Sequence, residues 1–309
     1  MSIQQRFLVR FWGVRGSYPT PGAGTVRHGG NTSCVEMQVG AGTGQTLIFD
    51  AGSGIIRLGE HLMQQKEQEA PLDASLFITH GHGDHLIGFP FFAPLFDPNT
   101  SLHVFGPHLV NYDVEQLVTQ LMSPPYFPVD MRNLPSHRTF HTTTDEQCVV
   151  WYGEHGTPRV GVLPHPIKQN EVCVVAKFTR SHPQDGAVIY RIEYAGRRVV
   201  YATDVEWQQG CDDDVVEFIE GADLLIHDAQ YTRHDYLQMK HGFGHSTIEM
   251  AVEAAQAAHV RELILFHHEP TYDDLQLDRM EAEAQSHFAR TRSACEGMEI
   301  DLLDKQRTE

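Results

Sequence analysis

The stretch that decides the fold is "THGHGDHLIG", residues 79–88. Three histidines and one aspartate fall within six positions, from His80 to His85. The two glycines between them tolerate positive φ and let neighbouring groups crowd together. A buried strand is predicted over residues 74–80, directly before the loop. The loop is therefore expected to direct four ligand-type side chains into one small volume.

The residue types in this loop favour a metal site. Imidazole and carboxylate groups bind borderline metals such as Zn, Mn or Fe. A catalytic ion must leave one position open for water, so four donors exceed the need of a single ion and indicate two ions. The alternative is a solvated polar loop without a metal. The four candidate ligands are His80, His82, Asp84 and His85.

The composition argues against a protein that binds long nucleic acid or a membrane. The chain has 309 residues and a net charge of −18, whereas binding a long polyanion requires a basic surface. No apolar run approaches the roughly 20 residues that cross a bilayer, and the N-terminus lacks the pattern of a secretory signal. Five scattered cysteines without a CxxC pair favour free thiols in a reducing compartment. We therefore expect a cytoplasmic protein.

The hydrophobic pattern predicts a single α/β domain over residues 1–309, with helices outside a layered sheet. Strands and helices alternate in two halves, and no linker separates the halves. Segment 89–140, rich in aromatic residues and proline, is predicted as an insertion, either a lid or partner surface or an ordinary capping segment. A helix is predicted over 273–294 and a last edge strand over 299–303.

The stretch "THGHGDH" matches the HxHxDH motif of the metallo-β-lactamase superfamily, and the chain resembles that superfamily from "FWGVRGS" to "HHEP". The stretches "FWGVRGSYPTPG", "HGGNTSC" and "PYFPV" resemble a bacterial subgroup described as cyclic-nucleotide-phosphodiesterase-like. "GFGHSTIEM" resembles the "GHST" segment of the ribonuclease Z-like branch. The resemblance implies a four-layer αββα sandwich.

The resemblance also implies the ligands of the first metal. The superfamily pairs the first two histidines of the motif with a third histidine from elsewhere in the chain. His182 fits that place, because it follows a predicted strand and precedes "YRIE". His155 and His165 are competitors, but no family motif surrounds them.

The second metal is implied to take Asp84, His85 and a histidine near the C-terminus. The family places this ligand directly after a buried strand, which selects His267 and leaves His268 as a neighbour. Asp204, in "VVYATDVE", fits the carboxylate that bridges both metals; the alternative is a turn residue at a strand end. The seven implied ligands are His80, His82, Asp84, His85, His182, Asp204 and His267.

The resemblance makes His245 and Asp84 the catalytic residues. Ser246 and Glu249 form an S-x-x-E capping box, which predicts a helix that begins just after His245. His245 would then lie beside a positive helix end and serve as a general acid or as a donor to a phosphoryl oxygen. The alternative is an ordinary residue before a helix cap.

Two further aspartates, Asp50 in "IFDAGSG" and Asp228 in "IHDAQY", are expected to support the metal loop without binding metal. Both are alternatively plain turn residues.

The expected cofactors are two divalent ions, with Zn as the first candidate and Mn or Fe as alternatives. We expect a metal-bridging hydroxide to attack the phosphorus of a small phosphodiester, with cyclic nucleotides as the first candidate substrates.

Alternative functions are hydrolysis of a lactone or thioester and, less favoured, RNA processing, because the basic glycine-rich arm of the family's tRNA enzymes has no counterpart here. Non-hydrolytic di-iron relatives place a glutamate where His82 stands and carry a flavin domain. Members of the subgroup are usually dimers, so a homodimer is expected.

Overall fold

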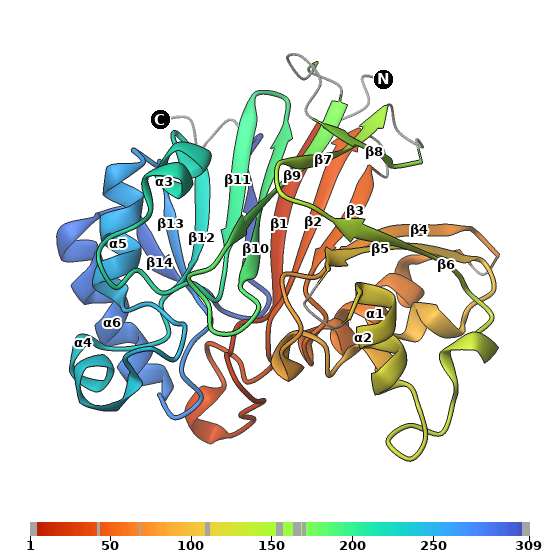
Figure 1. Cartoon of the computed structure of the whole chain (residues 1–309), viewed down its shortest axis with the longest axis horizontal. Coiled ribbons are helices and arrows are strands. Elements are labelled where there is room, and N and C mark those ends of the chain that lie inside the picture. Colours follow the sequence, from red (N-terminus) through yellow and green to blue (C-terminus); the bar gives the residue numbers. More distant parts are fainter. Residues whose placement is uncertain are drawn as a thin grey trace.

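The computed structural model describes residues 5–41, 44–67, 69–108, 112–152, 157–162, 168 and 171–304. Two β-sheets stand side by side, and helices flank them on both sides (Figure 1). Strands of the first sheet follow the order β15 (Glu299–Asp301), β1 (Gln5–Gly13), β2 (Cys34–Ala41), β3 (Gln45–Phe49), β4 (Leu72–Phe77), β5 (Thr100–Pro107) and β6 (His137–Thr143).

The second sheet is built from the C-terminal half of the chain. Its order is β14 (Thr291–Ser293), β13 (Leu263–Phe266), β12 (Leu224–Asp228), β11 (Arg197–Ala202), β10 (Ala187–Tyr194), β9 (Glu171–Thr179), β7 (Gln147–Tyr152) and β8 (Arg159–Val162). The helices are α1 (Gly54–Gln65), α2 (Val114–Leu121), α3 (Asp213–Ile219), α4 (Arg233–Asp235), α5 (Ile248–Ala257) and α6 (Asp274–His287). Short helical turns are η1 (Ala23–Thr25), η2 (Gly83–His85), η3 (Phe89–Phe91), η4 (Ala93–Phe96), η5 (Met131–Asn133) and the π-helical η6 (Tyr236–Lys240).

Three apolar cores hold these layers together. Alternate residues of β2, such as Val35 and Met37, face the core between the two sheets, because a strand directs every second side chain to the same face. Helix α1 presents Ile55 and Leu58 to the outer face of the first sheet. Helices α5 and α6 cover the outer face of the second sheet through residues such as Leu277. The order of layers is therefore helix, sheet, sheet, helix, as predicted.

One prediction from the sequence needs correction, and another stays a prediction. Strand β5 pairs in parallel with β4, and β6 pairs in parallel with β5, so residues 100–107 and 137–140 of segment 89–140 belong to the first sheet; the description of the segment as an insertion stays a prediction. The helix predicted over 273–294 ends at His287; at Phe288 the backbone becomes extended, and Thr291–Ser293 pairs with β13. The predicted edge strand is present as β15, antiparallel to β1.

The parallel part of the second sheet positions the site. Strands β11, β12, β13 and β14 run in the same direction, so their carboxyl ends share one edge. Asp204 follows β11, Asp228 ends β12 and His267 follows β13. Ligand sites of open α/β sheets form at such an edge. Within the described residues, no helix combines the length and apolar character needed to cross a membrane, and all five cysteines are free.

Candidate metal centre

The structure brings the seven predicted ligands together in two groups that share one residue. Within each group, one ligand atom from every residue lies within 4.8 Å of the others. The competitors His155 and His165 lie outside the described residues. The first group is His80, His82, His182 and Asp204; the second is Asp84, His85, His267 and Asp204.

Asp204 lies between the two groups and offers one carboxylate oxygen to each. Its Oδ1 is 3.6 Å from His80 Nε2 and 3.9 Å from His182 Nε2. Its Oδ2 is 3.1 Å from His85 Nε2 and 3.5 Å from His267 Nε2. The backbone of Asp204 has a φ of 57°, a sharp turn directly after β11. This arrangement is the one expected of a bridging carboxylate.

Hydrogen bonds fix which ring nitrogens carry protons. His182 Nδ1 lies 2.8 Å from the Gly244 carbonyl oxygen, which can only accept, so the proton is on Nδ1 and the Nε2 lone pair faces His82 Nδ1 at 3.0 Å. His85 Nδ1 donates to Asp50 Oδ2 at 2.8 Å, and its Nε2 lies 3.2 Å from His267 Nε2.

These contacts fit two divalent cations. His80 Nε2 is buried and has no hydrogen-bond partner among the described residues. Tetrahedral Zn–N bonds of about 2.0–2.1 Å would place two ligand nitrogens about 3.3 Å apart, close to the nitrogen separations in both groups. A cation in the first group would be a partner for His80 Nε2 and for the lone pair of His182 Nε2. A cation in the second group would be a shared partner for His85 Nε2 and His267 Nε2.

The charges around the two groups differ. Burial holds the pKa of His80 well below its ordinary value and lowers those of His82 and His182, so the three histidines of the first group are neutral imidazoles, the form that binds metal. In the second group burial alone would raise the pKa of Asp84, but His85 and His267 hold it well below its usual range. Burial lowers the pKa of His267, but Asp204, Asp84 and Asp228 together outweigh burial and raise that pKa to about 9. A cation in this group would take the place of that proton beside the carboxylates.

Asp50 holds the loop of the motif from behind. Its buried carboxylate accepts hydrogen bonds from the Thr79 backbone N–H at 2.9 Å, from His85 Nδ1, and from the Tyr201 hydroxyl at 3.0 Å. It belongs to none of the ligand groups. This geometry agrees with the supporting role expected of Asp50.

Glu206 is a further supporting residue, and no pattern in the sequence indicated it. Its buried carboxylate accepts from the backbone N–H groups of Gly242 at 2.7 Å and Gly244 at 2.8 Å, and from the Tyr236 hydroxyl at 2.7 Å. Gly244 in turn supplies the carbonyl oxygen that orients His182. Glu206 therefore positions a candidate ligand through the backbone of another loop.

The predicted capping box at Ser246 is wrong. Helix α5 begins at Ile248, and Thr247 is its N-cap, with a side chain that accepts from the Met250 N–H. The Ser246 hydroxyl is unavailable for capping because it donates to the Val205 carbonyl oxygen at 2.7 Å.

Asp228, not the helix end, positions His245. Its Oδ2 accepts from His245 Nδ1 at 2.8 Å, while its Oδ1 accepts from the backbone N–H groups of Ser246 and Gln230. The His245 ring stacks against His267 with centroids 4.9 Å apart. His245 therefore lies beside the second group with Nδ1 already bonded, and Nε2 is the ring nitrogen left for a substrate.

Residue His268 lies outside both groups, as expected. Its Nε2 donates to the Ala294 carbonyl oxygen at 3.0 Å, and the side chain is buried behind the site.

The N-terminal loop closes the second group from another side. The Ser17 backbone N–H donates to Asp84 Oδ2 at 2.7 Å. A Cβ atom added at Gly16 would lie 2.5 Å from the His267 ring, so only glycine leaves room for that ring.

Substitution of Gly16 by alanine should therefore weaken metal binding by the second group. Overpacking costs about 1–3 kcal/mol, so the dissociation constant of the more weakly held ion should rise roughly 5- to 150-fold. Chelator competition measures this constant. Gly22→Ala is the control, because nothing lies within 4 Å of its added Cβ. Equal constants for parent and Gly16→Ala would contradict the packing argument.

Residues 45–268 match the family model described as "Beta-lactamase superfamily domain". The chain belongs to the metallo-β-lactamase superfamily. Its sequence is 26% identical to the ribonuclease Z of Thermoplasma acidophilum, over 94% of this chain and 95% of that protein. The superfamily expected from the motif is thereby confirmed, and with it a hydrolase of a metal-dependent class.

Solved structures share the fold. The metallo-β-lactamase fold protein YhfI from Bacillus subtilis superposes with a TM-score of 0.66 at 21% identity, over 96% of this chain and all of that one. The short form of human tRNase Z gives a TM-score of 0.61 at 22% identity, over 95% and 98% of the two chains. The predicted αββα sandwich of the superfamily is confirmed.

Proposed function

We propose that this protein is a phosphodiesterase that uses two divalent ions, with cyclic nucleotides as the first candidate substrates. The observation that carries the proposal is the pair of ligand groups joined by Asp204, with His245 held beside them by Asp228. Zn is the expected metal, and Mn and Fe are alternatives. When bound, two such ions would lower the pKa of a water molecule and neutralise charge on a phosphoryl group.

Each residue of the site then has a defined task. The first ion would be held by His80, His82 and His182, the second by Asp84, His85 and His267, and Asp204 would face both. Asp228 fixes the His245 ring through Nδ1, so Nε2–H is the group that can donate a proton to a departing alkoxide.

An open cavity beside His182 supports a small substrate. It has a volume of about 620 Å³ and borders Glu206 and the exposed Arg180. Sites for small molecules measure about 300–1,000 Å³, so a mononucleotide fits the space. Arg180 places a cation at the rim of this cavity. The net charge of −18 opposes a long polyanion elsewhere on the surface.

One observation favours RNA processing as a second candidate function. The curated relative from Thermoplasma acidophilum, matched over nearly the full chain, is named ribonuclease Z. Hydrolysis of a lactone or thioester is the third candidate, because the same ligand set serves those reactions. The homodimer expected from the sequence stays a prediction.

A substrate panel tests the choice. Metal-loaded protein is assayed with cyclic nucleotides, a bis(aryl) phosphate, a precursor tRNA with a 3′ trailer, lactones and thioesters, and kcat/KM is compared. We expect the small phosphodiesters to exceed the other classes by at least about tenfold. RNA processing would replace the proposal if the kcat/KM for the precursor tRNA exceeded that for every small phosphodiester by at least about tenfold. Turnover of lactones or thioesters alone would refute phosphodiester hydrolysis altogether.

A further inference from the structure

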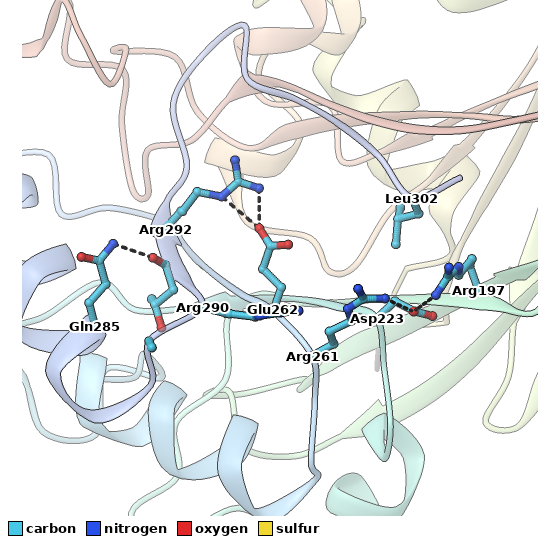
Figure 2. A pocket seen from close by; sticks show the side chains of 10 residues that line it. Arg197, Asp223, Arg261, Glu262, Gln285, Arg290, Arg292 and Leu302 are labelled. Carbon is cyan, nitrogen blue, oxygen red and sulfur yellow. Dashed lines mark hydrogen bonds and ion pairs between the residues drawn. The ribbon is translucent and has the colours of Figure 1, made fainter. Parts of the chain in front are cut away.

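A second cavity lies at the opposite end of the parallel strands from the metal centre. Its volume is about 350 Å³, and Figure 2 shows the side chains around it. Strand β11 begins there with Arg197, whereas Asp204 follows its other end. Seven residue steps of about 3.3 Å put about 20 Å between the two places. The cavity is lined by Arg197, Asp223, Arg261, Glu262, Gln285, Ala289, Arg290, Thr291, Arg292 and Leu302.

The lining carries a net positive charge on a chain that is strongly acidic overall. It holds four arginines and two carboxylates, so the difference, four minus two, is two positive charges, whereas the whole chain has −18. The charged residues of the lining come from the start of β11, from the segments just before β12, β13 and β14, and from β14 itself. The sheet therefore gathers four guanidinium groups at one edge.

The two carboxylates of the lining accept hydrogen bonds from neighbouring arginines and so orient them. Arg197 Nη1 donates to Asp223 Oδ1 at 2.8 Å, and Arg261 Nη1 lies 4.0 Å from the same oxygen. Arg292 donates from Nε, at 2.9 Å, and from Nη2 to one oxygen of Glu262 (Figure 2). A guanidinium has five N–H donors, so Arg197 and Arg292 keep donors beyond those that the two carboxylates accept.

The strongest indication of a ligand is the Arg290 side chain. Its side chain is exposed, and it makes no hydrogen bond or ion pair with another described residue. Arg292 Nη1 likewise has no hydrogen-bond partner in the described part of the chain. Arg290 and Arg292 line the same cavity, and like charges repel each other unless a counter-ion joins them. An anion in the cavity would meet both groups.

We propose that this cavity binds the dianionic phosphate group of a phosphomonoester or of inorganic phosphate. Such a group carries a charge of about −1.5 to −2 at pH 7, which matches the net charge of the lining. The planar fork of arginine pairs with two phosphate oxygens at once. A phosphodiester has a single negative charge and is the weaker ligand here. The proposal does not depend on the reaction at the metal centre.

Equilibrium binding on the metal-loaded protein tests the proposal. Inorganic phosphate, adenosine monophosphate and a cyclic nucleotide are titrated separately at fixed ionic strength. Because the metal centre can also bind phosphate, the parent is expected to bind two phosphates per chain. The cyclic nucleotide is a monoanionic diester, so its affinity compared with that of adenosine monophosphate tests the preference for a dianion. The affinities of inorganic phosphate and adenosine monophosphate, compared with each other, show which source of the dianion the cavity prefers.

The variant Arg290→Gln should bind one phosphate per chain, or bind the second at least tenfold more weakly, with unchanged turnover at the metal centre. The double variant Arg290→Gln, Arg292→Gln should lose the second phosphate completely. The control is Arg279→Gln, which removes the same charge from an exposed site on α6 outside the cavity. The proposal is overturned if Arg290→Gln and the double variant bind phosphate with the stoichiometry and affinity of the parent, or if the parent binds a single phosphate that a metal-free protein does not.

Discussion

Substitution of Asp204 by asparagine is expected to remove bound metal and turnover together. The Asp204 carboxylate faces both ligand groups, with Oδ1 toward His80 and Oδ2 toward His85. Asparagine keeps the size of the side chain but loses the negative charge and one acceptor oxygen. Loss of an outer-shell partner alone costs roughly 10- to 100-fold in metal affinity or activity, and loss of a shared carboxylate should cost more than that.

The measurement pairs elemental analysis of the purified protein with kcat for a bis(aryl) phosphate. We expect fewer than one ion per chain in Asp204→Asn, against two in the parent, and a kcat reduced by more than about a hundredfold. Asp213→Asn is the matched control, because Asp213 is exposed on α3 and belongs to no ligand group. A variant that keeps two ions and full turnover would show that Asp204 bridges nothing.

Substitution of His245 by alanine is expected to separate metal binding from catalysis. His245 is in neither of the two four-residue ligand groups; its one possible grouping is with Asp204, Asp228 and His267, and Asp228 already bonds its Nδ1, so both ions should stay bound. A positioned general acid contributes about 10²- to 10⁴-fold, and kcat should fall within that range. The loss should be larger for substrates with poor leaving groups, because aryl oxides need little protonation.

The variant Asp228→Asn provides the companion measurement. It removes the carboxylate that accepts from His245 Nδ1. We therefore expect kcat to fall by a larger factor than KM changes. His234→Ala, at an exposed histidine on α4, is the control for loss of an imidazole. If His245→Ala hydrolyses every phosphodiester at the parent rate, His245 has no part in proton transfer.

The candidate ligands could be found in the sequence because the motif loop, His182, Asp204 and His267 each follow a strand within three residues; that they bind metal stays a prediction. The apolar run before His267 and the run before Asp204 are visible in the sequence, and the order of strands in a layered sheet brings their ends together. The motif itself placed four ligands within six residues. Local pattern was sufficient wherever a residue's position depends only on the strand that precedes it.

The errors share one physical cause, which is a partner that lies far away in the sequence. Ser246 has the right spacing for a capping box, but its hydroxyl bonds to Val205, and Thr247 caps the helix instead. The segment after His287 continues a helical pattern until its pairing with β13 makes it a strand. Glu206 showed no pattern at all, because its three donors come from the loop around Gly242 and Gly244 and from Tyr236.

The candidate ligands are divided between the two sheets. The loop after β4 supplies four of them from the first sheet, and His182, Asp204 and His267 extend from the second. Neither half of the chain alone holds a complete set for either ion. With the ligands proposed above, both complete sets form only after the halves have docked, so we expect a nascent chain to acquire its ions once synthesis has passed β13.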